Sequence, residues 1–163
     1  MPIRHTDKGW YWGSKGPFAT RAKAQQIAAA AYASGYKEES VMDKNAVSEF
    51  IGNLFHSATV THFMHLQTKS YAQHIALGAY YEEIVELVDS VAETIQGCYG
   101  EIITGYPTMF ANVGNEPLEY LTSLQKFVAD TRTNMPQESN IQNEIDNVAT
   151  LIDSTIYKLK FLA

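Results

Sequence analysis

The chain has 163 residues, of which 45% are hydrophobic and 18% are charged. This balance is typical of a folded globular protein and excludes a largely disordered chain. A single cysteine excludes an intrachain disulfide, and no apolar run is long enough to span a membrane, so we expect a cytoplasmic protein without membrane partners.

The net charge of −6 is divided unevenly along the sequence. Residues 1–44 hold seven Lys or Arg against four acids, a net charge of +3, whereas residues 45–163 hold five against fourteen, a net charge of −9. A basic head favours contact with phosphate, and an acidic body attracts cations. An ordinary solvated surface explains the same counts, so charge alone leaves both interpretations open.

The first predicted elements are a hairpin over residues 8–18 and a helix over 21–34. Glycines and a proline separate the two short strands, while Thr20 is placed to cap the helix and Gly35 to end it. Trp10 and Trp12 share one strand face, which either docks on bases or a partner or packs on the following helix. Residues 1–42 therefore read as an appendage, with these candidate contacts to a partner or nucleic acid: Trp10, Trp12, Arg4, Lys8 and Lys15.

Residues 43–163 carry four long amphipathic segments. The predicted helices cover 43–69, 73–99, from 116 or 117 to before Pro136, and from 139 onward. Short joins make the first two and the last two antiparallel neighbours. The linker over 100–115 is long enough to return along the roughly 40 Å of the second helix. The sequence therefore predicts an all-α fold, a four-helix bundle with room for a long crossover.

The predicted apolar stripes define a candidate core. The first two helices contribute Val47, Ile51, Leu54, Ala58, His65, Leu77, Tyr81, Ile84, Val88, Val91 and Ile95. The last two contribute Leu118, Leu121, Leu124, Phe127, Val128, Ile141, Ile145, Val148, Ile152, Ile156 and Leu159.

Four carboxylates follow one stripe on the second helix of the bundle. On a helical wheel they lie opposite the apolar stripe, so they face away from their own core: Glu82, Glu86, Asp89 and Glu93. Apart from His74, no basic residue occurs from Ser70 through Gln125 to relieve this charge. The stripe is either a solvated acidic face or a face that another subunit covers.

Four of the five histidines lie between His56 and His74. The wheel of the first bundle helix places His65 near the centre of the apolar stripe, as a hydrogen-bonded core residue, and His56 at the exposed side. His62 lies at the edge of the stripe, and His74 begins the next helix. Imidazole and carboxylate together suit iron, zinc or manganese.

The segment HFMHLQTKSYAQH, followed by DSVAE, resembles the ferroxidase signature of the Dps family, the dodecameric mini-ferritins. That signature reads H-W-x-x-x-G-x-x-F-x-x-x-H and then D-x-x-A-E. The two patterns agree at His62, His74, Asp89, Ala92 and Glu93. They differ where the family has tryptophan, glycine and phenylalanine and this chain has Phe63, Gln67 and Ser70. The resemblance covers roughly residues 45–163, and the head resembles small segments of bacteriophage proteins.

The resemblance implies a ferritin-like bundle that assembles as a dodecameric shell built on twofold dimers. It implies that His62 and His74 of one subunit and Asp89 and Glu93 of its mate bind Fe²⁺, which peroxide or dioxygen oxidises and the shell stores. Glu82 and Glu86 would be accessory cation sites, and zinc or manganese are alternative metals.

Two other functions compete with ferroxidase. One is a catalytically silent structural or virion-associated protein that docks through the aromatic head, in a bacterium or an infected host cell. The other is weak DNA binding through the basic head, multiplied by assembly.

Overall fold

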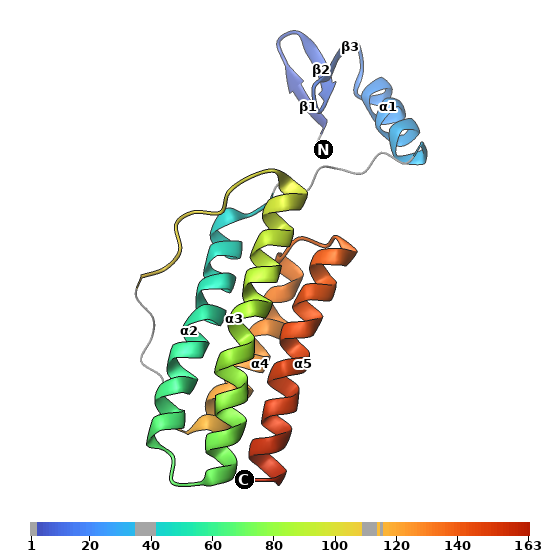
Figure 1. Ribbon diagram of the computed structural model, residues 1–163. Coiled ribbons are helices and arrows are strands. Elements are labelled where there is room, and N and C mark those ends of the chain that lie inside the picture. The colour runs from blue at the N-terminus through green and yellow to red at the C-terminus, as the bar shows by residue number, and fades with distance from the viewer. Residues whose placement is uncertain (1–2, 35–41, 109–113, 115) are drawn as a thin grey trace. The chain divides into compact units, whose positions relative to one another are not determined.

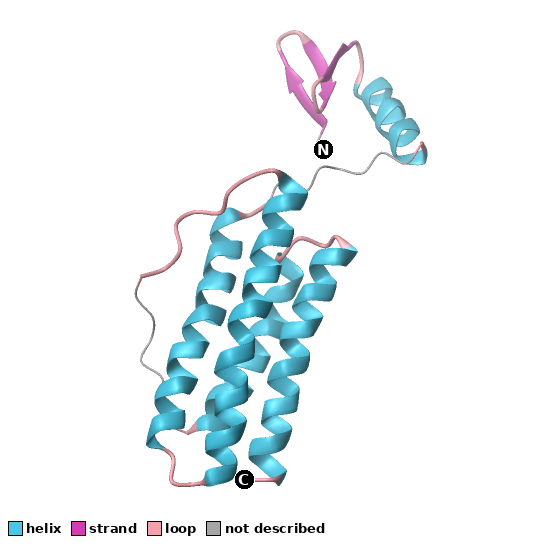
Figure 2. Cartoon of the chain, in the orientation of Figure 1, coloured by secondary structure: helices cyan, strands magenta, loops and turns pink. Residues whose placement is uncertain are grey.

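The structure is a computed structural model that describes residues 3–34, 42–108, 114 and 116–163. The chain divides into two compact units, Met1–Val41 and Met42–Ala163. Within the described residues there are five α-helices and one three-stranded antiparallel sheet (Figure 2). The fold is therefore mainly helical with a small sheet near its N-terminus, as predicted at that level of detail.

The first unit contains β1 (Ile3–Thr6), β2 (Gly9–Trp12), β3 (Lys15–Phe18) and α1 (Arg21–Ala33). The sheet has the order β1-β2-β3, so the predicted hairpin corresponds to β2 and β3, and β1 is an additional strand. The Thr20 side chain caps α1 by accepting from the Lys23 amide, as predicted. The expected helix stop at Gly35 lies outside the described residues.

The tryptophans of β2 contact their own unit. Trp12 is 2% exposed and meets Tyr32 of α1 edge-on, with ring centroids 5.9 Å apart. Trp10 is half-buried, pairs in register with Phe18 and lies under the Arg21 guanidinium. Of the two alternatives for this pair, packing on the unit's own helix is the one observed for Trp12.

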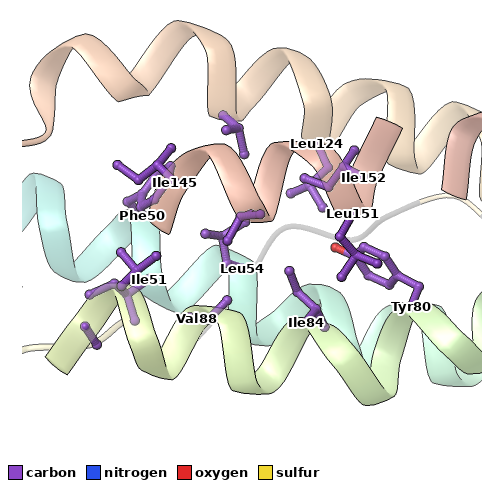
Figure 3. Close-up of a cluster of buried hydrophobic side chains, with 14 of the residues drawn as sticks. Phe50, Ile51, Leu54, Tyr80, Ile84, Val88, Leu124, Ile145, Leu151 and Ile152 are labelled. Atoms are coloured by element: carbon purple, nitrogen blue, oxygen red, sulfur yellow. The ribbon is translucent and has the colours of Figure 1, made fainter. Parts of the chain in front are cut away.

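The second unit contains α2 (Lys44–Gln67), α3 (Tyr71–Tyr99), α4 (Pro117–Thr131), a 3-10 turn at Arg132–Asn134, and α5 (Ser139–Phe161). Each predicted helix is present, with ends shifted by a few residues. All four helices contribute to one apolar core, part of which Figure 3 shows between facing ribbons. Among the described residues, no helix is both long and apolar enough to cross a membrane.

Contacts between helix ends give the directions of the four helices. Asn140 at the start of α5 bonds Cys98 at the end of α3, so these two helices are antiparallel. The helices α4 and α5 are antiparallel as well, because residues later along one contact residues earlier along the other: Gln125 bonds Asp153, and Arg132 bonds Asp146. Consequently α3 and α4 run in the same direction, which requires the connection between them to return along the bundle (Figure 1).

The described part of that connection lies against α2. A Cβ added at Gly52 would stand 2.6 Å from Cγ of Pro107, so the absence of a side chain at Gly52 lets the connection pass close to the helix. At Pro107 the connection therefore passes directly beside α2. Residues 109–113 and 115 of the predicted linker lie outside the described residues.

Two predicted core positions are wrong. In α2 the buried residues nearest the C-terminus are Thr61 and Met64, while His65 is only half-buried. In α3 the core contains Tyr80 in place of Tyr81. Tyr80 is buried because its hydroxyl has a hydrogen-bond partner on α2. The Ser57 hydroxyl donates to the carbonyl oxygen of Leu54, so the Ser57 oxygen accepts from the Tyr80 hydroxyl at 2.9 Å. This partner makes full burial of a tyrosine favourable.

Candidate functional site

Three histidines and a tyrosine gather where α2 ends and α3 begins. The rings of His65 and His74 stack with centroids 3.7 Å apart and an interplanar angle of 22°. His62 stacks on Tyr81 at 4.2 Å and 15°, and the His62 and His65 rings are 5.9 Å apart. The structure therefore brings His62 and His74, the two predicted imidazole ligands, to one end of the bundle, with His65 between them.

His65 and His74 are also joined by two reciprocal hydrogen bonds. Nδ1 of His65 lies 2.8 Å from the carbonyl oxygen of His74, and Nδ1 of His74 lies 3.1 Å from that of His65. A carbonyl oxygen only accepts, so each Nδ1 carries the proton. In a neutral imidazole each Nε2 then keeps its lone pair, which is the state that binds a metal ion.

A compact turn produces this arrangement. Ser70 caps α3 by accepting from the Gln73 amide, and Thr68 accepts from the Ser70 amide while donating to the Gln73 side chain. These bonds join the two helices through a three-residue turn and align His65 with His74. Gly78 completes the fit, because an added Cβ there would lie 3.3 Å from Cε1 of His65.

The four carboxylates lie on the exposed side of α3, as the helical wheel predicts: Glu82, Glu86, Asp89 and Glu93. Tyr106, from the connection after α3, is close enough to Asp89 to respond to its charge. Partial burial, and secondarily the Asp89 carboxylate, raise the pKa of Tyr106.

One chain does not bring the predicted ligands together. His74 and Asp89 are separated by fifteen residues of one helix, which is about 22 Å at roughly 1.5 Å per residue. Across the described ranges, no three His, Cys, Asp or Glu side chains lie close enough together to hold a metal ion. The structure thus separates the predicted site into an imidazole half and a carboxylate half.

Sequence reasoning missed His65 as a member of the cluster. The sequence feature that indicates this pairing is the spacing of nine residues between His65 and His74 across a predicted turn. A helical wheel drawn for one helix does not show it, because the two residues lie on different helices. The two remaining histidines lie elsewhere. His56, expected at the exposed side of α2, is half-buried there, and burial lowers its pKa. His5 contacts Trp10 in the first unit, with the two rings tilted by 42°.

Large apolar side chains are exposed around the imidazole half. Four of them lie on the helical hairpin of α2 and α3, and we call them the hairpin surface: Phe63 at 58% exposed, Leu66 at 68%, Tyr71 at 79% and Ile75 at 52%. The C-terminal end of α5 lies at the same end of the bundle (Figure 1) and exposes Tyr157, Phe161 and Leu162. Several large apolar groups exposed on neighbouring turns are typical of an interaction surface.

The first unit presents exposed cations beside aromatic rings. Arg4 lies over Tyr11 at 5.4 Å and Lys15 over Trp12 at 5.7 Å, and Lys8 is exposed in the turn before β2. The ion pairs that the structure describes all lie in the second unit. Within residues 3–34 these cations therefore keep their charge unneutralised by a carboxylate.

Residues 65–159 match the profile of a family of unknown function, DUF5856. The chain belongs to this family. The matched region begins at His65 and includes His74, Asp89 and Glu93, but His62 precedes it. No curated protein and no solved structure matches the chain.

Proposed function

We propose that this DUF5856 protein assembles into an oligomer in which His62 and His74 of one copy meet Asp89 and Glu93 of another and bind Fe²⁺ for oxidation. The observation that carries the proposal is the separation of the two halves. The imidazoles of His62 and His74 lie at one end of the bundle, with the Nε2 lone pair of His74 free, and carboxylates lie exposed about 22 Å from His74 along the same helix. Each half is accessible, and each lacks the ligands that the other supplies.

The residue types suit iron as a substrate. Neutral imidazole and ionised carboxylate are ligands that iron, zinc and manganese accept, and protons compete with the metal for both. Peroxide would take one electron from each of two Fe²⁺ ions and, with two protons, leave as water. The product Fe³⁺ would be stored inside the oligomer, with Glu82 and Glu86 as accessory cation sites.

The course of the chain supports a ferritin-like bundle. Antiparallel pairs α2–α3 and α4–α5, with α3 and α4 parallel, are the arrangement in which one long crossover joins two helical hairpins. The described contact between Pro107 and Gly52 is consistent with a crossover along α2. In the Dps family, which the sequence resembles, such a bundle assembles as a dodecameric shell built on twofold dimers.

The hairpin surface supplies a reason to assemble. Its four apolar side chains are each more than half exposed in the single chain, and they border His62 and His74. Burying apolar surface contributes about 25 cal/mol per Å². Lys69 at the same end adds a positive charge that complements the acidic face of α3 on another copy. A second copy therefore suits this surface in both its apolar character and its charge.

Iron oxidation tests the proposal directly. Fe²⁺ is added anaerobically, peroxide follows, and near-ultraviolet absorbance of Fe³⁺ is recorded. We expect His62→Ala and Asp89→Ala each to abolish the signal, while Glu119→Ala, which removes an exposed carboxylate from α4, leaves it unchanged. If both site variants oxidise iron like the unaltered protein, the assignment is wrong. An oligomer that forms but never oxidises iron would favour the silent structural role.

A second function, nucleic-acid binding, is favoured by the unneutralised cations of the first unit. Exposed lysine and arginine beside aromatic rings suit a phosphate backbone, and binding through them falls as salt rises. We expect the full chain to retard a DNA duplex in a gel at low salt and to release it as salt rises. Replacing Arg4, Lys8 and Lys15 by Gln should remove this retardation, whereas replacing Lys126 and Lys160 of the second unit by Gln should not.

A further inference from the structure

We propose that His65 is a positioning residue for the metal-binding imidazole of His74. This inference rests on the proposed function, and it assigns a role to a histidine that lies outside the four-residue signature. Three observations support it: the reciprocal hydrogen bonds, the ring stacking, and the space that Gly78 leaves for the His65 ring.

The backbone of residue 65 selects the tautomer of His74. Because the His65 carbonyl accepts from Nδ1 of His74, the proton is held on Nδ1 and the Nε2 lone pair stays free for Fe²⁺. Metal-binding histidines commonly donate their other ring nitrogen to a carbonyl or carboxylate in this way. His74 therefore has the outer partner expected of a ligand before any metal arrives.

The side chain of His65 fixes where that ligand points. Its Nδ1–H donates to the carbonyl of His74 and ties the first turn of α3 to the last turn of α2. Its ring stacks on the His74 ring with centroids 3.7 Å apart, and this contact restricts rotation of the His74 side chain. One side chain thus sets both the backbone position and the ring plane of the ligand.

The α3 backbone supports His65 in turn. An added Cβ at Gly78 would lie 3.3 Å from Cε1 and 3.4 Å from Nδ1 of His65, so the ring rests against a helix turn without a side chain. A methyl group at this position would press on the ring on the side of the atom that donates to His74. The stacked pair is therefore held between the turn and Gly78.

Cobalt binding to the assembled protein tests this role, with Co²⁺ as a stable probe for Fe²⁺. Three variants remove Nε2 of residue 65 while keeping different parts of the proposed role. His65→Asn keeps an amide donor near the place of Nδ1, His65→Phe keeps a ring wall, and His65→Ala keeps neither. We expect His65→Ala to weaken Co²⁺ binding about tenfold, within the 10–100-fold range usual for such partners, with Asn and Phe between it and the unaltered protein.

Other outcomes overturn the inference. If all three variants bind Co²⁺ as poorly as His74→Ala, His65 is itself a ligand, and if all three bind normally, it has no role. Should His65→Ala fail to fold, as thermal unfolding and sedimentation would show, the Asn and Phe variants carry the comparison. If His74→Ala binds Co²⁺ normally, the proposed function fails, whatever residue 65 does.

Nitrogen NMR supplies a readout that a merely structural role would not produce. In protein labelled with ¹⁵N-histidine, two-bond proton–nitrogen spectra distinguish protonated from unprotonated ring nitrogens, and His74→Gln identifies the resonances of His74. We expect the neutral imidazole of His74 in the metal-free protein to carry its proton on Nδ1. A proton on Nε2 in its place would refute the arrangement.

Discussion

Two variants that are each inactive should regain activity when they assemble together. One variant combines His62→Ala with His74→Ala and keeps its carboxylates, and the other combines Asp89→Ala with Glu93→Ala and keeps its imidazoles. Metal ligands lie about 2 Å from the ion. Along α3, His74 and Asp89 are about 22 Å apart, so no single chain can supply both to one ion.

The size of the recovery follows from this separation. In a random mixture of equal amounts, half of all imidazole halves are intact, and half of those face an intact carboxylate half. About a quarter of the sites are then complete, whichever symmetry relates the copies. We therefore expect co-assembled protein to oxidise Fe²⁺ at about a quarter of the initial rate of the unaltered oligomer, while each variant alone stays near the background rate.

Co-expression of the two variants produces the mixed oligomer, and mass spectrometry gives their ratio. Peroxide-dependent oxidation of Fe²⁺ is then followed by absorbance at equal subunit concentrations. Variants assembled separately and mixed afterwards are the control, since without exchange they contain no complete site. Mixed oligomers no more active than either parent would refute the claim that the site lies between copies.

Two further predictions concern stability. Gly52→Ala should destabilise the second unit by about 1–3 kcal/mol, because the added Cβ would overlap Pro107. Gly97→Ala on α3 should stabilise it by up to about 1 kcal/mol, because the added Cβ meets nothing within 4 Å and alanine favours the helix. Equal unfolding midpoints of the two variants in urea would contradict this. Burial raises the pKa of Tyr120 to about 12 and also raises that of Tyr80. Unfolding exposes these phenols to ionisation near pH 10, so the free energy of unfolding should fall between about pH 10 and 12, by at most ~1.4 kcal/mol per pH unit for each tyrosine. Tyr120→Phe should reduce that slope.

The helices were largely predictable because their ends carry local signals. Asp43 caps α2 by accepting from the amides of Asn45 and Ala46, an interaction written into a few adjacent residues. β1 was missed for the opposite reason. Its four residues are mostly exposed, and the strand exists through its pairing with β2. Elements that form because of adjacent residues were predicted from the sequence, and the strand that forms through pairing with another strand was not.

The candidate site was predictable only in part. The exposure of Asp89 and Glu93 followed from the period of one helix, which a wheel expresses directly. The pairing of His65 with His74 required knowledge of how two helices align across a turn. The choice of Tyr80 over Tyr81 likewise depended on Ser57, a residue on the neighbouring helix.

The reciprocal histidine pair also limits how the turn before α3 can vary among related proteins. Inserting one residue between Thr68 and Ser70 would separate the two caps whose hydrogen bonds join α2 to α3, and would change how the two helices align. Both carbonyl bonds of the pair would then be lost together. Relatives that keep this pair should tolerate changes of composition in the turn, yet conserve its length.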